Sequence, residues 1–202
     1  MIENKKIGVI ILAAGSSSRL GRPKQLVEFK GKLLLQQVIE VADFFQFDTK
    51  MMVLGAKSKE IINDIEPGNF RVVMNEEWEE GMSTSIKSGL AASLKSEKHL
   101  EHILILVSDQ PFVSKENIDS LIKVQLENKA PATFSKYSGE LGVPAIFSKE
   151  LFSELGKLEG DQGAKKLLIN GEIEYQTVSF EAGNFDVDTK EDVELLKQME
   201  KK

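Results

Sequence analysis

One loop near the start of the chain combines small residues, hydroxyl groups and positive charges. Residues 12–24 read LAAGSSSRLGRPK and follow directly on an apolar run. The small residues let a ligand approach the backbone, and successive N–H groups together with the serine hydroxyls can surround anionic oxygens. Arg19 and Lys24 add the positive charge that a triphosphate requires. The loop therefore predicts a phosphate-binding site. Because Lys24 follows Pro23 in a loop, we expect its side chain to be exposed and its replacement to leave folding nearly intact.

The loop differs from both standard phosphate-binding patterns. The P-loop ends in Gly-Lys-Ser/Thr directly before a helix, whereas here Gly21 is followed by Arg22, Pro23 and Lys24. Pro23 disfavours helical geometry at Arg22, so an extended segment leads to Lys24. The dinucleotide-binding pattern G-x-G-x-x-G is absent as well. An ordinary strand-to-helix turn rich in small residues is the alternative interpretation.

Carboxylates follow later apolar runs and could hold a hard cation. Asp109 follows the run ILILV, and Asp186 and Asp188 stand in the segment FDVD. Magnesium prefers one or two carboxylates plus phosphate oxygens and water, so Asp109 with one of the other two would suffice. Turn or cap chemistry would also explain them, since Asp188-Thr189 is a good helix N-cap. Alternation along FDVD sends both carboxylates to one side, so either could face the site.

Two further segments could contribute amides and hydroxyls. Ser83 and Ser85 follow Gly81 and could cap a helix while directing hydroxyls at a ligand, although capping alone explains them equally well. The segment GDQGAKK, residues 160–166, places backbone amides and two lysines at an expected helix start. It could contact an acceptor phosphate, and solvated lysines are the alternative.

Phosphoryl chemistry of this kind needs no strong protein base. A phosphate monoester, with a second pKa near ~6, is already largely ionised at pH 7, so a protein contributes positioning and charge neutralisation. The two histidines, His99 and His102, lie before or at the start of an expected strand. We expect both at the surface or edge of the sheet, away from the chemistry.

Strands and helices that would position these residues alternate along the chain. Short apolar runs separated by amphipathic stretches predict parallel strands joined by crossover helices. Ligands then gather at the carboxyl ends of the strands, which selects the first loop, Asn75, Asp109 and residues 186–188. The expected strands are Ile7–Leu12, Thr49–Leu54, Phe70–Met74, His102–Val107, Ala130–Phe134, Val143–Phe147 and Ile173–Phe180. The expected helices are Leu33–Phe45, Ser58–Ile65, Ser83–Leu94, Ser114–Glu127, Lys149–Leu155, Gly163–Ile169 and Thr189–Lys201.

Composition narrows the possible partners. The 202 residues, 41% of them hydrophobic, suit a single α/β domain over residues 1–202. A net charge of -6 and a pI near 5.2 argue against nonspecific nucleic-acid or membrane-surface binding. The absence of cysteine excludes disulfides, zinc–thiolate sites and a cysteine nucleophile, and fits a cytoplasmic protein. The first apolar run is too short for a membrane span or a signal segment.

Several segments in order resemble one known family. LAAGSSSRLGRPK is similar to the signature L-A-A-G-x-S-x-R-x-G-x-x-K of the molybdopterin nucleotidyltransferases, which include molybdenum cofactor cytidylyltransferase and its guanylyltransferase relative. Together these similar segments span nearly the whole chain. The others are NEEWEEGMSTSIKSGL (75–90), VSDQP (107–111), GVPAIF (142–147), GDQGAKKLL (160–168) and FDVDTKEDVELL (185–196).

The resemblance implies a three-layer, Rossmann-like α/β fold with a mostly parallel sheet. It also implies a magnesium-dependent transfer of CMP from CTP to the phosphate of a molybdopterin-type acceptor, with release of pyrophosphate. Arg19 and Lys24 would be catalytic, and Asp109 and Asp188 would bind Mg²⁺. The expected nucleotide-binding residues are Leu12, Ala13, Ala14, Gly15, Ser16, Ser17, Lys24, Asn75, Gly81, Ser83 and Ser85.

The sequence is also compatible with other functions. The choice of CTP rests on LAAG where guanylyl relatives usually carry LAGG, so Ala14 is the informative position. A sugar- or alditol-phosphate nucleotidyltransferase would share the fold and a similar first loop. A noncatalytic nucleotide-binding protein that assists a molybdoenzyme is a third possibility. Transient contact with such an enzyme is expected under the leading interpretation.

Overall fold

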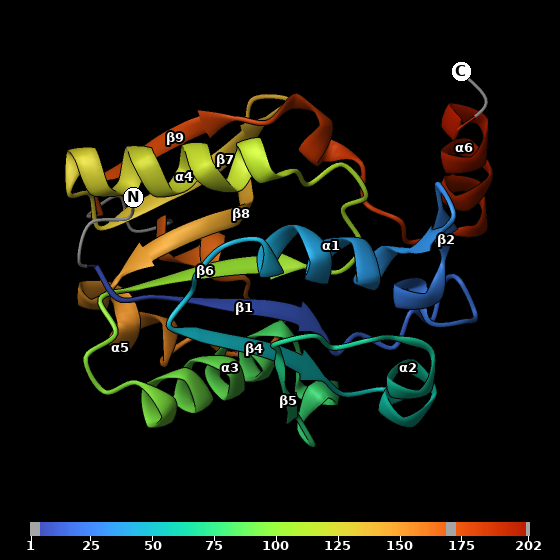
Figure 1. Ribbon diagram of the computed structural model, residues 1–202, viewed down its shortest axis with the longest axis horizontal. Helices are drawn as coiled ribbons and strands as arrows, with labels where there is room; N and C mark the ends of the chain where they lie inside the picture. Colours follow the sequence, from blue (N-terminus) through green and yellow to red (C-terminus); the bar gives the residue numbers. More distant parts are fainter. Residues whose placement is uncertain (1–4, 169–172, 201–202) are drawn as a thin grey trace.

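The apolar runs of the chain form a seven-stranded sheet in the computed structural model, which describes residues 5–168 and 173–200. The strand order is β5-β4-β1-β6-β8-β7-β9 (Figure 1). Neighbouring strands are parallel except at β8, which runs antiparallel to both β6 and β7. The sheet strands are β1 (Ile7–Ala13), β4 (Thr49–Leu54), β5 (Arg71–Met74), β6 (His102–Val107), β7 (Ala132–Tyr137), β8 (Glu140–Ser148) and β9 (Tyr175–Ser179).

The central strands are apolar along their whole length because both of their faces are covered. All seven residues of β1 are buried, as is typical of strands inside a doubly covered parallel sheet. In the register, Ala13 pairs with Leu54 of β4 and Leu12 pairs with Val107 of β6. The loops after β1, β4 and β6 therefore leave the sheet at one edge, where ligands of open α/β sheets bind.

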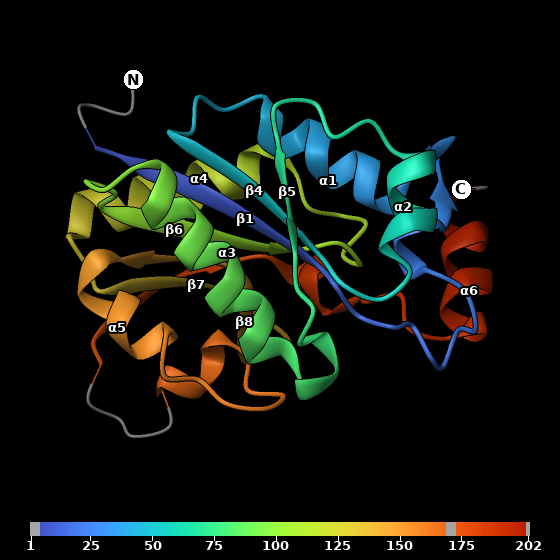
Figure 2. The same cartoon turned by 90° about the horizontal axis from the view of Figure 1, so that it is seen from below.

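Helices cover the two faces of the sheet and complete a three-layer architecture. Apolar residues of α1 (Leu34–Asp43), α2 (Ser58–Asp64) and α4 (Lys115–Asn128) pack on one face. Those of α3 (Met82–Ser96) and α5 (Phe152–Leu155) pack on the other face, where α3 crosses the sheet (Figure 2). This confirms the Rossmann-like α/β fold with a mostly parallel sheet. Within the described ranges, no helix is long and apolar enough to cross a membrane.

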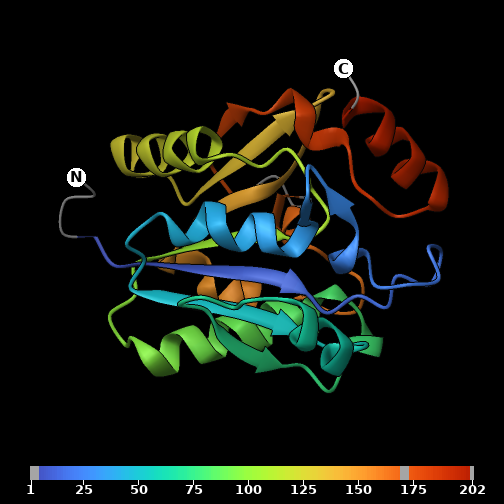
Figure 3. The ribbon, with the colours of Figure 1, turned by 45° about the vertical axis from the view of Figure 1, so that its right-hand side comes forward.

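A small third core closes one end of the molecule. The two-stranded hairpin of β2 (Glu28–Phe29) and β3 (Lys32–Leu33) lies beside α6 (Lys190–Glu200), which is red in Figure 3. Val193 and Leu196 of α6 pack there with Leu20, Val27 and Phe29. The end of the chain is thereby held against the loop that follows β1.

The expected elements match the observed ones closely, with a few differences. The hairpin of β2 and β3 was not predicted, because two-residue strands show no periodicity. The expected helix at Gly163–Ile169 is a 3₁₀ helix over Ala164–Leu168. Two expected helix ends, Ile169 and Lys201, lie outside the described residues. Further 3₁₀ turns occur at Lys24–Leu26, Trp78–Glu80, Lys149–Leu151 and Glu181–Asn184.

Candidate active site

A cavity of about 320 Å³ lies at the carboxyl ends of β1 and β6. Its walls come from the loop after β1, the segment after β6, the start of α3 and residue Asp161. Eight of the expected nucleotide-binding residues line it, and the expected metal ligand Asp109 does so too. Those eight are Leu12, Ala13, Ala14, Gly15, Ser16, Lys24, Gly81 and Ser85.

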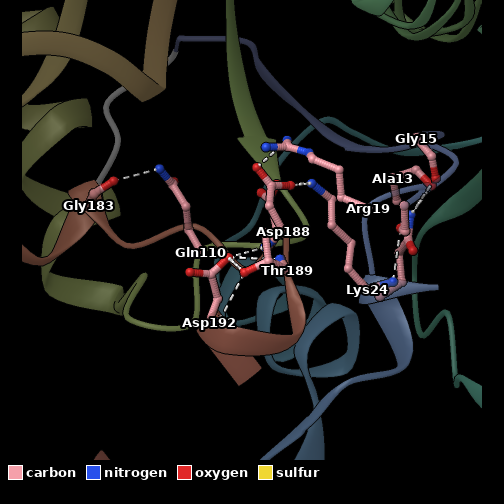
Figure 4. A network of polar contacts seen from close by, with 12 residues as sticks. Ala13, Gly15, Arg19, Lys24, Gln110, Gly183, Asp188, Thr189 and Asp192 are labelled. Carbon is pink, nitrogen blue, oxygen red and sulfur yellow. Dashed lines mark hydrogen bonds and ion pairs between the residues drawn. The ribbon is translucent and has the colours of Figure 1, made fainter. Parts of the chain in front are cut away.

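A charged cluster joins three distant segments at one side of this cavity. The ammonium of Lys24 donates hydrogen bonds to Asp109 Oδ2 and, over 2.8 Å, to Asp188 Oδ1. The guanidinium of Arg19 contacts the other oxygen of Asp188 at 2.7 Å (Figure 4). The structure thus brings together all four residues expected to act in catalysis or metal binding. Lys24 is not exposed as expected, since its side chain retains only 17% of its accessible surface.

Two local contacts aim Asp188 at the cluster. Thr189 and Asp192 form a reciprocal cap at the start of α6: the Asp192 amide donates to the Thr189 hydroxyl, and the Asp192 carboxylate accepts from the Thr189 amide at 2.8 Å (Figure 4). The Asp188 carboxylate is therefore not needed as the helix cap. The amide of Val187 donates to the carbonyl of Asp109 at 3.1 Å, which holds the segment of Asp188 beside the end of β6.

The charges in the cluster shift the pKa values of Lys24 and Asp188 in opposite directions. Burial alone would lower the pKa of Lys24, but Asp109 and Asp188 raise it overall. Burial opposes ionisation of Asp188, yet the contacts with Lys24 and Arg19 lower its pKa. Lys24 therefore stays an ammonium, and Asp188 stays a carboxylate, at neutral pH.

Asp186 is a third carboxylate near the cluster, and its pKa is raised, whereas that of Asp188 is lowered. Surrounding protein atoms desolvate its carboxyl group and the charge of Asp109 repels it, which together raise its pKa to about 6. The residue as a whole is nevertheless exposed to solvent. Near neutral pH, Asp186 is the member of the group that most readily takes up a proton.

Asn75 and Ser83 support the opposite wall of the cavity from behind. The amide of Asn75 donates to the hydroxyls of Thr84 and Ser85 at 2.8 and 2.9 Å, and its oxygen accepts from the Glu77 amide. The amide of Ser83 donates to the carbonyl of Gly160 at 3.1 Å. Neither residue lines the cavity, so their contacts hold the start of α3 in place.

Two glycines allow close approaches at this wall. Gly81 has φ +109°, and a Cβ there would lie 2.3 Å from the carbonyl carbon of Gly160. A Cβ on Gly55 would lie 2.6 Å from Cβ of Trp78 and 2.9 Å from the carbonyl oxygen of Ala14. Side chains at these positions would push the 160s loop and Trp78 away from the cavity.

The loop after β1 is closed by Ser17. This residue has φ +54°, and its hydroxyl accepts a hydrogen bond of 3.0 Å from the backbone amide of Lys24. Ser17 does not line the cavity. Its contact fixes the distance along the loop between the small residues and Lys24.

A larger hollow of about 670 Å³ lies at the opposite edge of the sheet. Four lysines and four carboxylates line it, so its charges balance and it lacks the excess of cations that a triphosphate would need.

His102 lines this larger hollow. Contrary to expectation it is buried, with 8% of its surface exposed, because Gln125 of α4 packs beside it. Burial lowers the pKa of its imidazole.

Comparison with known proteins assigns the chain to a family. The model of the MobA-like NTP transferase domain matches residues 9–177. The chain belongs to this family. It is therefore a nucleotidyltransferase by descent, and the matched residues include the loop after β1 and Asp109.

Relatives of this MobA-like domain carry diverse names. It is 28% identical to nicotine blue oxidoreductase of Paenarthrobacter nicotinovorans, covering 93% of this chain and 94% of the relative. It is 25% identical to purine catabolism protein PucB of Bacillus subtilis, covering 94% and 95%. It is 28% identical to a probable molybdenum cofactor guanylyltransferase of Aquifex aeolicus, covering 94% and 90%.

Solved structures show the same fold over nearly the whole chain. The Rv0371c homologue from Mycobacterium sp. strain JC1 superposes with a TM-score of 0.82 at 29% identity, covering 95% of this chain and 96% of that one. Rv0371c of Mycobacterium tuberculosis, in complex with manganese, superposes with a TM-score of 0.76 at 25% identity, covering 96% and 99%. One structural neighbour of this MobA-like domain thus binds a divalent metal.

The carboxylates of the MobA-like domain fit a divalent cation only together with a ligand's oxygens. The described residues contain no group of three or more His, Cys, Asp or Glu side chains poised for a metal. Asp109 and Asp188 instead share the ammonium of Lys24, and Asp109 Oδ1 is buried without a hydrogen-bond partner. Magnesium prefers this kind of site, in which two carboxylates are completed by phosphate oxygens and water.

Some lining residues of the MobA-like domain were not predicted. Gln25 lines the cavity although no part of its surface is exposed to bulk solvent, and Glu79, Ser108 and Asp161 also line it. The only signal for Gln25 was its place directly after Lys24 and before the apolar pair Leu26-Val27. Burial of that amide depends on how the loop folds back, which local sequence does not show.

Proposed function

We propose that this chain transfers CMP from CTP to the terminal phosphate of a molybdopterin-type acceptor and releases pyrophosphate, with Mg²⁺ as its cofactor. The observation that carries the proposal is the cluster of Lys24, Asp109, Asp188 and Arg19 beside a cavity lined by small loop residues. Membership of the family and similarity to a molybdenum cofactor guanylyltransferase support the reaction class and the acceptor.

The charges of the cluster explain why a cation must accompany the triphosphate. Lys24 and Arg19 carry two positive charges, and Asp109 and Asp188 carry two negative charges. These four side chains leave no net positive charge for a triphosphate. When bound, Mg²⁺ supplies that charge and orients the phosphate oxygens. Asp109 and Asp188 would hold it, and Lys24 would then be free to turn from the carboxylates to the phosphates.

In the reaction, an oxygen of the acceptor phosphate attacks the α-phosphorus of CTP. The bond from the α-phosphorus to its bridging oxygen breaks, and the electron pair leaves with pyrophosphate. Because the attacking phosphate is already ionised at pH 7, no residue has to remove a proton. Lys24 stabilises the charge that builds on the leaving pyrophosphate, Arg19 neutralises the phosphate tail, and the loop after β1 holds the oxygens in line.

Ala14 supports the choice of a pyrimidine. Ala14 lines the cavity, and it packs in the same core cluster as Leu12 and Trp78. Alanine at this position leaves less room for the base than glycine would, because it carries one more methyl group. That difference favours the smaller base of CTP over that of GTP.

The segment that follows Gly160 supports a place for the acceptor. Asp161 lines the cavity, and Gly163 packs against Met82, which lines it as well. Lys165 is paired with Glu140, and Lys166 is exposed. Lys166 lines a neighbouring hollow together with Gln162 and Gly163, and its charge is available there to the acceptor's phosphate.

An oxidoreductase is a second candidate, supported by the similarity to nicotine blue oxidoreductase over 93% of this chain. The same cavity would then hold a redox ligand. That function leaves unexplained the pairing of two carboxylates around Lys24, which suits metal-assisted phosphoryl chemistry.

The test is an assay of pyrophosphate release from CTP, GTP, ATP and UTP with magnesium, each with and without a purified molybdopterin-type acceptor and with sugar phosphates as further acceptors. Acceptor-dependent release with CTP is the expected result. Release only with a sugar or alditol phosphate would move the function to that class. Nucleotide binding without release in any arm would leave a noncatalytic accessory protein.

A further inference from the structure

The three carbonyl groups at the start of the loop after β1 all accept hydrogen bonds from the protein. Gln25 Nε2 donates to the carbonyl of Ala13 at 2.8 Å and to that of Gly15 at 3.4 Å; dashed lines mark these contacts in Figure 4. The amide of Ala56 donates to the carbonyl of Ala14 at 3.1 Å. Each carbonyl in this run of three thus has a donor within the protein.

Because peptide groups are planar, the directions of these carbonyls also fix the directions of the N–H groups that follow them. In a trans peptide the N–H of the next residue points away from the carbonyl of the preceding one. The N–H groups of Ala14, Gly15 and Ser16 therefore each point away from the donor that holds the preceding carbonyl. These same three residues line the cavity. Successive N–H groups that face one cavity are the arrangement that binds phosphate oxygens.

Gln25 is placed for this role by the turn that carries Lys24. The 3₁₀ turn Lys24–Leu26 sends adjacent side chains in different directions, with Lys24 toward Asp109 and Gln25 toward the carbonyls of Ala13 and Gly15. Gln25 has no exposed surface, and its Oε1 is buried without a partner. A buried amide that leaves its acceptor unpaired is costly for folding, which indicates that the two donated bonds serve another purpose.

We infer that Gln25 is a positioning residue that orients the phosphate-binding N–H groups of the loop. The inference rests on the proposed function, since it assumes that this loop binds a triphosphate. Gln25 acts through the backbone and makes no contact with the ligand itself. Ala56 performs the same task for the middle carbonyl, but its backbone amide cannot be removed by a simple substitution.

Gln25→Met tests the inference, because methionine keeps the length of the side chain and lacks the donor. Gln125→Met is the matched control. Gln125 is also fully buried and also spans polar partners, donating to the carbonyl of Ala130 at 2.6 Å and accepting from Thr133 at 2.7 Å, but it lies at the opposite edge of the sheet. Gln25→Glu is a second variant that keeps the shape and replaces the donor by an oxygen.

The measurements are calorimetric affinities for magnesium tripolyphosphate and for cytidine, with thermal unfolding of each variant. Gln25→Met should weaken tripolyphosphate binding roughly 10- to 100-fold, equivalent to one charge-assisted hydrogen bond, and leave the affinity for cytidine unchanged. Gln25→Glu should weaken it at least as much. Gln125→Met should lower the melting temperature and leave both affinities unchanged.

Two outcomes separate this inference from the proposed function. Tripolyphosphate affinity at the wild-type level in both folded Gln25 variants would overturn the positioning role and leave the proposed function intact. Failure of the wild-type protein to bind tripolyphosphate or CTP at all would overturn the proposed function itself. An equal loss of cytidine and tripolyphosphate binding in Gln25→Met would also refute the inference, since a collapsed cavity would explain it.

Discussion

Lys24 and Asp188 form an ion pair of 2.8 Å although 164 positions separate them in the chain. The contact joins the first loop of the sheet to the segment that enters the last helix. Lys24 also bonds Asp109, so a single ammonium group connects three segments and contacts two carboxylates. The proposed reaction needs this cluster to open, because the same carboxylates would hold a cation and the same ammonium would contact the phosphates.

The first prediction concerns replacement of Lys24. Removing one preorganised charge partner typically costs on the order of 10² to 10³ in rate, so Lys24→Ala should lose about that much kcat for pyrophosphate release. Lys24→Arg should restore only part of it, because a planar guanidinium cannot place its charge at the same point. Steady-state kinetics of the three proteins is the measurement. Wild-type kcat in Lys24→Ala would remove the residue from the mechanism.

Burial of Lys24 changes the expected effect on folding. Its loss leaves Asp109 without a counter-charge and Asp188 with Arg19 alone, which should cost about 1–3 kcal/mol of unfolding free energy. We therefore expect a lower melting temperature for Lys24→Ala, and rates must be compared well below it. Magnesium should recover part of the lost stability in this variant, because the cation can then replace the ammonium.

The second prediction concerns the divalent cation. Triphosphate binding should fall at least about tenfold when magnesium is removed with EDTA, because the four charged side chains of the cluster sum to zero and Asp109 repels the phosphates. Calorimetry of CTP binding with and without magnesium measures this. Asp109→Asn and Asp188→Asn should each raise the magnesium concentration required, whereas Asp119→Asn on the surface of α4 should not. Equal CTP affinity in EDTA and in magnesium would contradict the two-carboxylate site.

The third prediction follows from Asp186, an exposed residue whose carboxyl group is desolvated by nearby protein atoms and repelled by Asp109, which raises its pKa from 3.8 to about 6. Between these values the folded protein binds a proton more tightly than the unfolded chain, so stability falls as pH rises from about 4 to about 6. Asp186→Asn removes this loss. The variant should melt at a higher temperature than wild type at pH 7.5, and the difference should vanish near pH 4.

Thermal unfolding from pH 4 to pH 8 tests the Asp186 prediction, with Asp119→Asn as a surface control. A melting-temperature difference that stays constant over this range would show that the effect of the substitution is not the titration of Asp186. A variant that is less stable than wild type at pH 7.5 would show that its carboxylate makes a favourable contact instead.

The sequence predicted the layers of this molecule better than its contacts. Short apolar runs predicted buried strands, and most of them were followed by a stretch of helical period, so the sheet and its carboxyl edge followed; the antiparallel pair of β7 and β8, which no helix separates, was the exception. The choice between Asp186 and Asp188 depended on which residue caps α6. Thr189 and Asp192 share that role, and no local pattern distinguishes it from a cap by Asp188. Gln25 was not predicted as a site residue because its hydrogen-bond partners are main-chain carbonyls. Their positions depend on how the loop folds and not on residue types.

The last prediction concerns base selection by Ala14. Ala14→Gly removes a methyl group from the cavity wall and should shift the ratio of CTP to GTP turnover toward GTP. A single methyl group in a pocket is worth at most about 1–3 kcal/mol, so the ratio of kcat/KM values should change by no more than roughly 10- to 200-fold.

Glycine also loosens the backbone of the loop, which would lower both activities without altering their ratio. Ala13→Gly separates these effects, because the methyl group of Ala13 packs into the core on the other face of the sheet. That variant should lower both rates and keep the CTP preference of wild type. If Ala14→Gly keeps the same preference as Ala13→Gly, the base is selected elsewhere, and the wall formed by Trp78 and Ser85 becomes the next position to vary.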